Sequence, residues 1–118
     1  MLKIDVDNKD SVTIVRIEGE VDLYSSPEVR KTILELVNQK PEAIVVNLGQ
    51  VGYMDSSGLA TLVEGLQQVG KYSGKFVLAN LRTEVKEVFT LSHLDKVFEI
   101  YESLGEALKS VGADGTGN

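Results

Sequence analysis

The feature that most constrains the fold is the apolar run Ala43–Leu48, in which Asn47 is the one polar residue. A nearly continuous apolar run of this kind is typical of a central strand that is covered on both faces. After a short polar segment, apolar residues recur at spacings of three and four over 59–69, which predicts an amphipathic helix. A buried strand that leads into such a helix indicates a fold in which helices cover a sheet.

Two strands are expected ahead of this unit. Over 2–8, Leu2, Ile4 and Val6 alternate with polar residues in a strand-like pattern. The following segment, Val12–Glu18, is rich in β-branched residues and also predicts a strand. The turn-like residues 8–11 between the two segments favour a hairpin.

A helix is expected next, ending near Gln39. Pro27 suits its first turn, because the missing N–H of proline would have no partner inside the helix there. Ser26 would then be the N-cap, whereas Ser25 with Glu28 three residues later offers a capping box. The sequence leaves both starting registers open.

The second half of the chain alternates strands with helices. The expected elements are a strand at Lys75–Asn80, a helix at roughly 83–91, a strand at Val97–Tyr101 and a helix around Leu104–Val111. Ser103 and Glu106 give the last helix a capping-box pattern. Because this alternation demands parallel pairing with right-handed crossovers, the sequence predicts an α/β fold. We expect a mixed sheet of about five strands, with parallel core pairs, and about four helices.

The 118 residues fit a single domain, expected at 1–111, and the Gly-rich segment 112–118 is expected to be a disordered tail. A net charge of −6 argues against general nucleic-acid binding, which needs clustered Lys and Arg. No apolar run approaches the roughly 18 residues of a membrane span. Met1–Asp5 lacks the apolar core of a signal peptide, so we expect a cytoplasmic location.

The polar segment between the central strand and its helix contains Asp55-Ser56-Ser57-Gly58. Asp and Ser favour helix N-caps because their oxygens accept the unpaired N–H groups of the first turn, and Gly58 would allow a tight turn. The same position suits a phosphorylation switch on Ser56 or Ser57. A phosphoryl group there would meet free N–H donors and the positive end of the helix dipole. It would also add about −1.5 to −2 charge next to Asp55.

The chain resembles the bacterial anti-sigma factor antagonists of the STAS family. The resemblance rests on Ile44–Leu48 followed by Tyr53–Leu59, and on the Gly-Glu-aliphatic-Asp stretch Gly19–Asp22. A further likeness to the third helix of that family covers 85–92, and the whole resemblance spans about residues 3–111. It implies a small mixed sheet with helices, in agreement with the element order.

The resemblance implies a non-enzymatic protein that binds an anti-sigma factor, often a serine kinase, and so frees a sigma factor. The kinase would phosphorylate Ser56, with Ser57 in reserve, and a PP2C-type phosphatase would reverse the step. Asp22 would lie near the acceptor. We expect a monomer without cofactor or metal. The expected partner-binding residues are Asp22, Tyr24, Ser25, Asp55, Ser57, Gly58 and Thr61, the last on an exposed flank of the helix.

Other interpretations stay open. A STAS protein could serve another signalling assembly or a transport system, because a fold is shared more widely than its partners. A small hydrolase or phosphotransferase using Ser56 belongs to a different class. Asp22 with Asp55 is a poor signature for Mg²⁺. A triad of Ser92, His93 and a nearby Asp lacks a Gly-x-Ser-x-Gly elbow.

Overall fold

The computed structural model describes residues 1–113 and shows an α/β domain. The strands are β1 (Leu2–Lys9), β2 (Val12–Val21), β3 (Ala43–Met54), β4 (Lys75–Ala79) and β5 (Glu99–Tyr101). The helices are α1 (Ser26–Val37), α2 (Ser56–Gly70), α3 (Thr83–Leu91) and α4 (Leu104–Ser110), with a single 3-10 turn, η1 (Leu94–Lys96), before β5.

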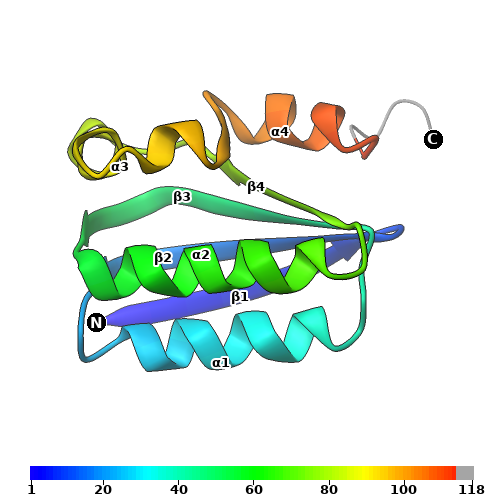
Figure 1. Cartoon of the computed structure of the whole chain (residues 1–118), viewed down its shortest axis with the longest axis horizontal. Coiled ribbons are helices and arrows are strands. Elements are labelled where there is room, and N and C mark those ends of the chain that lie inside the picture. The colour runs from blue at the N-terminus through cyan, green and yellow to red at the C-terminus, as the bar shows by residue number, and fades with distance from the viewer. Residues whose placement is uncertain (114–118) are drawn as a thin grey trace.

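The five strands form one sheet in the order β1-β2-β3-β4-β5. β1 pairs antiparallel with β2, and every other neighbouring pair is parallel, so the predicted mixed sheet is confirmed. Helices α1 and α2 run side by side along one face of the sheet (Figure 1). Each parallel crossover returns the chain through a helix, so α1 and α2 both begin where β2 and β3 end. This topology gathers the Asp22 loop and the Asp55 segment at one end of the domain.

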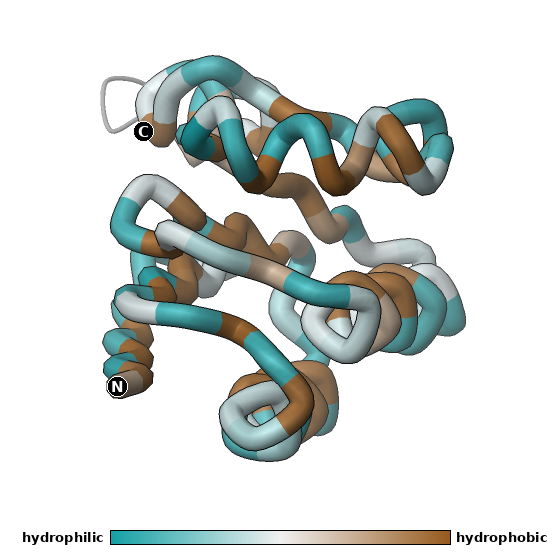
Figure 2. The backbone as a smooth tube through the Cα atoms, turned by 90° about the vertical axis from the view of Figure 1, so that its left-hand side faces the viewer, coloured by the Kyte–Doolittle hydropathy of each residue, from teal (hydrophilic) through white to brown (hydrophobic). Residues whose placement is uncertain are grey.

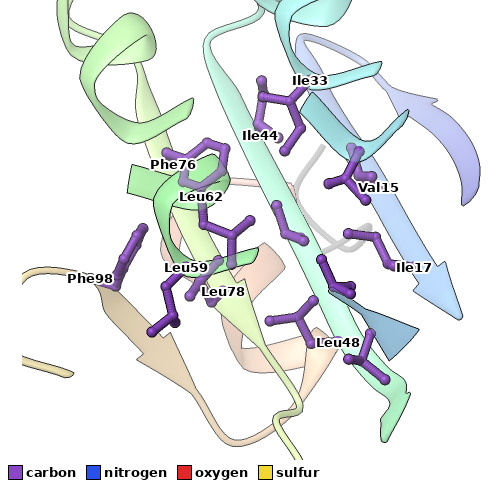
Figure 3. Packing of buried hydrophobic residues seen from close by; sticks show 14 of the residues in the cluster. Val15, Ile17, Ile33, Ile44, Leu48, Leu59, Leu62, Phe76, Leu78 and Phe98 are labelled. Carbon is purple, nitrogen blue, oxygen red and sulfur yellow. The ribbon is translucent and has the colours of Figure 1, made fainter. Parts of the chain in front are cut away.

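The main core lies between the sheet and the helices α1 and α2, and it also includes Val85 and Phe89 of α3. Figure 3 shows Leu59 and Leu62 of α2 and Ile33 of α1 packing toward the apolar side chains of β2, β3 and β4. A smaller cluster on the opposite face joins Val45 and Val77 to Ala107 of α4. The central strand β3 is therefore covered on both faces, as its apolar run predicts.

Strand β1 forms one edge of the sheet and has a clear difference between its faces. Leu2 and Ile4 pack against the main core, and the neighbouring Lys3 and Asp5 are charged and exposed. Figure 2 shows this alternation of apolar and polar residues next to the N-terminus. The predicted weak strand and its hairpin with β2 are confirmed.

Several boundaries differ from the sequence prediction. Strand β3 continues past Leu48 to Met54, because β2 pairs with it as far as Met54. Helix α1 begins at Ser26, so Ser25 and not Ser26 occupies the N-cap position, although its side chain makes no capping bond. The predicted strand at Val97–Tyr101 is shortened at its start, because the Val97 N–H closes the η1 turn on Leu94.

The end of the described chain also differs from the prediction. Gly112 and Ala113 were expected in a disordered tail, but Ala113 is buried and its N–H donates to the Leu108 carbonyl at 2.8 Å. The ordered domain therefore extends at least to Ala113. Residues 114–118, the rest of the predicted tail, lie outside the described residues. At the start of α4, the Ser103 hydroxyl accepts from the Glu106 N–H, which confirms the predicted cap.

Candidate functional site

The candidate site lies where β2 and β3 end and where α1 and α2 begin. The Asp55 N–H donates to the Val21 carbonyl at 3.1 Å, so the two segments are directly joined. Gly58 makes the closest approach: a Cβ atom there would lie 2.9 Å from Val21 Cγ1 and 2.7 Å from Met54 Cγ. A side chain at this position would force its neighbours to shift, so glycine lets the helix begin close against β2.

Asp55 is the N-cap of α2 and has the extended backbone typical of that position. Its Oδ1 atom accepts from the Ser57 N–H at 2.9 Å, the Gly58 N–H at 3.4 Å and the Ser57 hydroxyl at 2.5 Å. The Ser57 hydroxyl lowers the pKa of the Asp55 carboxyl most, and the N–H groups of Gly58, Ser57 and Leu23 lower it further against the opposing effect of burial. Asp55 is therefore a carboxylate at neutral pH, and the predicted cap is confirmed.

The two serines of the motif have different surroundings. Ser57 is half-buried and its hydroxyl is used by Asp55. Ser56, the first residue of α2, is exposed, and its hydroxyl has no hydrogen-bond partner within residues 1–113. Solvent and a partner protein can reach the Ser56 hydroxyl without breaking an existing interaction. This difference distinguishes the two neighbours, which spacing in the sequence alone does not.

The position of Asp55 changes one expectation about a phosphoryl group on Ser56. The sequence suggested that free N–H groups of the first turn would receive it, but the N–H groups of Ser57 and Gly58 already donate to the Asp55 carboxylate. That expectation is wrong for these two donors. A phosphoryl group on Ser56 would therefore not find these two N–H groups free, and it would lie next to the Asp55 carboxylate in the chain.

The loop between β2 and α1 is held together by Asp22. Its carboxylate accepts from the Tyr24 N–H at 2.9 Å and the Ser25 N–H at 3.0 Å, as in an Asx-turn. The Ser25 hydroxyl donates to the Glu20 carbonyl at 2.7 Å and accepts from the Asp22 N–H at 3.0 Å. These bonds give the loop a fixed shape directly after Val21, whose carbonyl anchors Asp55.

The fixed loop presents large apolar side chains to solvent. Tyr24 is 90% exposed and Leu23 is 67% exposed, and Tyr53 at the end of β3 is 51% exposed. Exposed apolar side chains gathered around one feature often mark an interaction surface. Leu23 was missing from the set predicted from sequence, and its signal was an apolar residue inside a turn that no strand or helix pattern required.

Two of the predicted partner-binding residues are buried. Thr61 was expected on an exposed flank of α2, but only 7% of it is exposed, so that prediction is wrong. Its helical position turns it inward with Leu62. Gly65 of the same helix is also buried, against Phe76 and Ile33. Gly58 is also buried, and its role is the close approach described above.

The described residues outside this site give little support to the alternatives of a metal site or a catalytic triad. Within residues 1–113 no group of three or more His, Cys, Asp or Glu side chains could hold a metal ion. The Ser92 hydroxyl donates to the Val88 carbonyl at 2.6 Å, and within residues 1–113 it makes no hydrogen bond to the exposed His93 of the kind that a triad needs. In the same part of the chain, every helix is too short or too polar to cross a bilayer.

Comparison with known proteins places the geometry in context. The family model described as "STAS domain" matches residues 3–107. The anti-sigma-B factor antagonist of Bacillus subtilis (strain 168) is 31% identical over 99 residues, which cover 84% of this chain and 90% of that protein. The anti-sigma F factor antagonist of Paenibacillus polymyxa is 30% identical over 108 residues, with 91% and 92% covered.

A solved structure has the same fold. The crystal structure of an anti-sigma factor antagonist from Mycobacterium paratuberculosis superposes with a TM-score of 0.88 at 30% identity and covers 94% of each chain. The family match spans β1 to α4 and includes both segments of the candidate site. The chain therefore belongs to the STAS domain family.

Proposed function

We propose that this protein is an anti-sigma factor antagonist that binds an anti-sigma factor while Ser56 is unmodified and releases it when Ser56 is phosphorylated. The observation that carries the proposal is the free, exposed Ser56 hydroxyl at the start of a helix whose cap is already made by Asp55. The relatives that match most of the chain are named as antagonists of anti-sigma factors, which supports the same assignment.

Ser56 is the preferred acceptor because it can be modified at no cost to the helix cap. Phosphorylation of Ser57 would remove the hydroxyl hydrogen that Asp55 accepts and would place two anions in contact. Phosphorylation of Ser56 leaves the bonds of the cap in place. A kinase that selects by accessible geometry would therefore modify Ser56, and Ser57 would serve as part of the support.

The switch would act through charge and not through refolding. A phosphoryl group adds about −1.5 to −2 charge at neutral pH. The surroundings are already acidic: Glu20, Asp22 and Glu28 line a hollow of about 290 Å³ between the N-terminus, the end of β2 and the start of α1. A partner fitted to this end of the domain would meet added negative charge and bulk at its contact surface. The complex would weaken while the domain keeps its fold.

The binding surface would combine the exposed side chains around Ser56. Tyr24 and Leu23 lie on the loop that Asp22 holds, and Tyr53 precedes the acceptor segment. Because the bonds to Asp22 already fix the backbone of this loop, binding would cost little further backbone entropy there. Asp22, Ser25 and Asp55 support this surface mainly through the shape of the backbone, and Gly58 supports it through packing.

In this proposal the chemistry belongs to the partners. The anti-sigma factor would be a serine kinase that transfers a phosphoryl group from ATP to the Ser56 oxygen. A PP2C-type phosphatase would hydrolyse the phosphoserine and restore binding. The protein itself would act in the cytoplasm, as a monomer and as a substrate of both enzymes, and would not be an enzyme.

The proposal is tested by incubating the protein with ATP and a candidate anti-sigma factor kinase from the same organism, followed by mapping of the modified residue by mass spectrometry. We expect one phosphate on Ser56 in the wild type, none in Ser56→Ala and continued modification in Ser57→Ala. Phosphate at another residue would rule out the switch. Phosphoserine that forms and turns over without any kinase would favour a hydrolase or phosphotransferase instead.

A further inference from the structure

The end of strand β3 that leads to Ser56 has a neighbouring strand on one side only. Strand β4 pairs with β3 over Ala43–Asn47 and then ends at Ala79. Strand β3 continues to Met54 with β2 as its partner, and their register shifts twice in this stretch. On the side that β4 does not reach, the backbone of this segment has no strand partner, although the side chains of Leu48, Val51 and Met54 are buried in the main core.

The loop between β4 and α3 covers the open side of β3. The Arg82 Nε–H donates to the Gly49 carbonyl at 3.0 Å. The Asn80 amide occupies the space beside Gly49, where a Cβ atom would lie 2.2 Å from Asn80 Nδ2. One guanidinium nitrogen of Arg82 also reaches toward Gly52, at 3.6 Å from the place of a Cβ atom. We call these contacts of Asn80 and Arg82 with β3 the clasp.

The clasp is itself anchored to the sheet. Asn80 has a left-handed backbone with φ of 66°, which asparagine tolerates better than most residues, and its N–H donates to the Tyr101 carbonyl of β5 at 3.0 Å. Gly49 is held from its own strand as well, since its N–H donates to Asn47 Oδ1 at 3.0 Å. The clasp therefore connects the bulged part of β3 to β5.

Arg82 differs from several other cations of the domain. Arg16, Arg30 and Lys86 all form ion pairs with carboxylates. In the described part of the chain Arg82 makes no ion pair, and the bond that it makes is to a backbone carbonyl. Although Arg82 is at the N-cap position of α3, its side chain does not cap that helix. The hydrogen bond of the Arg82 side chain is thus to β3, the strand that leads to Ser56.

We propose that Arg82 is a positioning residue for the acceptor serine: it holds the part of β3 that β4 does not reach, and so presents Ser56 in one geometry to the partner. This inference rests on the proposed function. Strand β3 passes directly into the Asp55 cap, so movement of Gly49–Gly52 would be transmitted to Ser56 through a short extended segment.

The clasp can be tested without any partner, by hydrogen exchange on the whole chain. We expect Arg82→Met to speed amide exchange in 49–57 by about threefold or more, the effect of losing one hydrogen bond of ordinary strength, while β1 and β2 residues before Glu18 keep their rates. Arg82→Lys, which retains a cationic donor, should restore most of the protection. Lys86→Met removes an exposed cation of the nearby helix α3 that pairs with Glu102, and should leave the exchange rates of 49–57 unchanged.

The positioning role is tested by the rate at which the candidate anti-sigma factor kinase phosphorylates Ser56. We expect Arg82→Met to lower that rate by about threefold or more, Arg82→Lys to recover it in part and Lys86→Met to match the wild type. A wild-type rate in Arg82→Met, or an equal loss in Lys86→Met, overturns the inference and leaves the proposed function intact. If the wild type itself takes no phosphate on Ser56, the proposed function fails, while the exchange rates still decide whether the clasp exists.

Discussion

The Ser57 hydroxyl donates to the Asp55 carboxylate at 2.5 Å, and this contact separates the two neighbouring serines into a supporting residue and a free one. The same carboxylate accepts the N–H groups of Ser57 and Gly58. The cap of α2 is thus complete before Ser56 is modified. The negative charge of Asp55 stays at the start of the helix, where the positive end of the helix dipole favours it.

Replacement of Ser57 by alanine should raise the pKa of Asp55. The Ser57 hydroxyl is the largest cause that holds this pKa below its ordinary value of 3.8. Because the folded pKa lies below the unfolded one, the carboxylate stabilises the fold above about pH 3.8, and this contribution is lost as the pH falls through the folded pKa. NMR titration of the Asp55 carboxyl carbon in both proteins measures the change. An identical pKa in Ser57→Ala would contradict this account of the contact.

Gly58→Ala and Gly70→Ala should have opposite effects on the free energy of unfolding. A Cβ at Gly58 meets Met54 and Val21 at less than 3.0 Å, so the helix start must shift, at a cost of about 1–3 kcal/mol. At Gly70, in the same helix, a Cβ meets nothing within 4 Å, and alanine should stabilise by about 0.5–1 kcal/mol. Urea denaturation monitored by circular dichroism tests both. A stable Gly58→Ala would show that the approach of α2 to β2 is not tight.

The order of elements was predictable because most of them are local patterns. The helix at roughly 83–91 and the capped α4 follow from short-range spacing and were confirmed. The extension of β3 to Met54 was not predictable, because its cause is pairing with β2, a contact distant in sequence. The polar residue Gln50 and the glycines Gly49 and Gly52 make that stretch resemble a loop.

The candidate site was predictable in part for the same reason. Asp55 as a cap is a local pattern, and the structure shows the bonds that the pattern implies. Which serine keeps a free hydroxyl depends on which of the two donates to Asp55. The burial of Thr61 depends on how α2 turns against the sheet. The Arg82 contact joins residues 33 positions apart, and no spacing in the sequence indicates it.

Tyr24→Ala should weaken binding to the anti-sigma factor without affecting the fold. Because the Tyr24 side chain is 90% exposed, its removal should change the free energy of unfolding by no more than about 0.5 kcal/mol. A central aromatic anchor is commonly worth about 2 kcal/mol in an interface, or about thirtyfold in Kd. Val6→Ala, at a 43% exposed position on β1, is the control and should bind normally. Calorimetry with the candidate partner measures both, and equal affinities for Tyr24→Ala and the wild type would remove this loop from the interface.

Ser56→Asp should reproduce part of the phosphorylated state, because it places a carboxylate at the free position beside Asp55. We expect the Kd for the anti-sigma factor to rise about tenfold or more, since a charge left unpaired against a fitted partner surface is costly. Ser56→Ala should bind like the wild type. Ser73→Asp is the matched control: it adds the same charge at an exposed serine in the turn after α2, beside Lys40 and Lys75 at a hollow separate from the candidate site. Its affinity should stay within about twofold, because charges separated by more than about 10 Å are largely screened at 0.1 M salt. An equal loss of affinity in Ser56→Asp and Ser73→Asp would show that total charge, and not its position at Ser56, controls the complex.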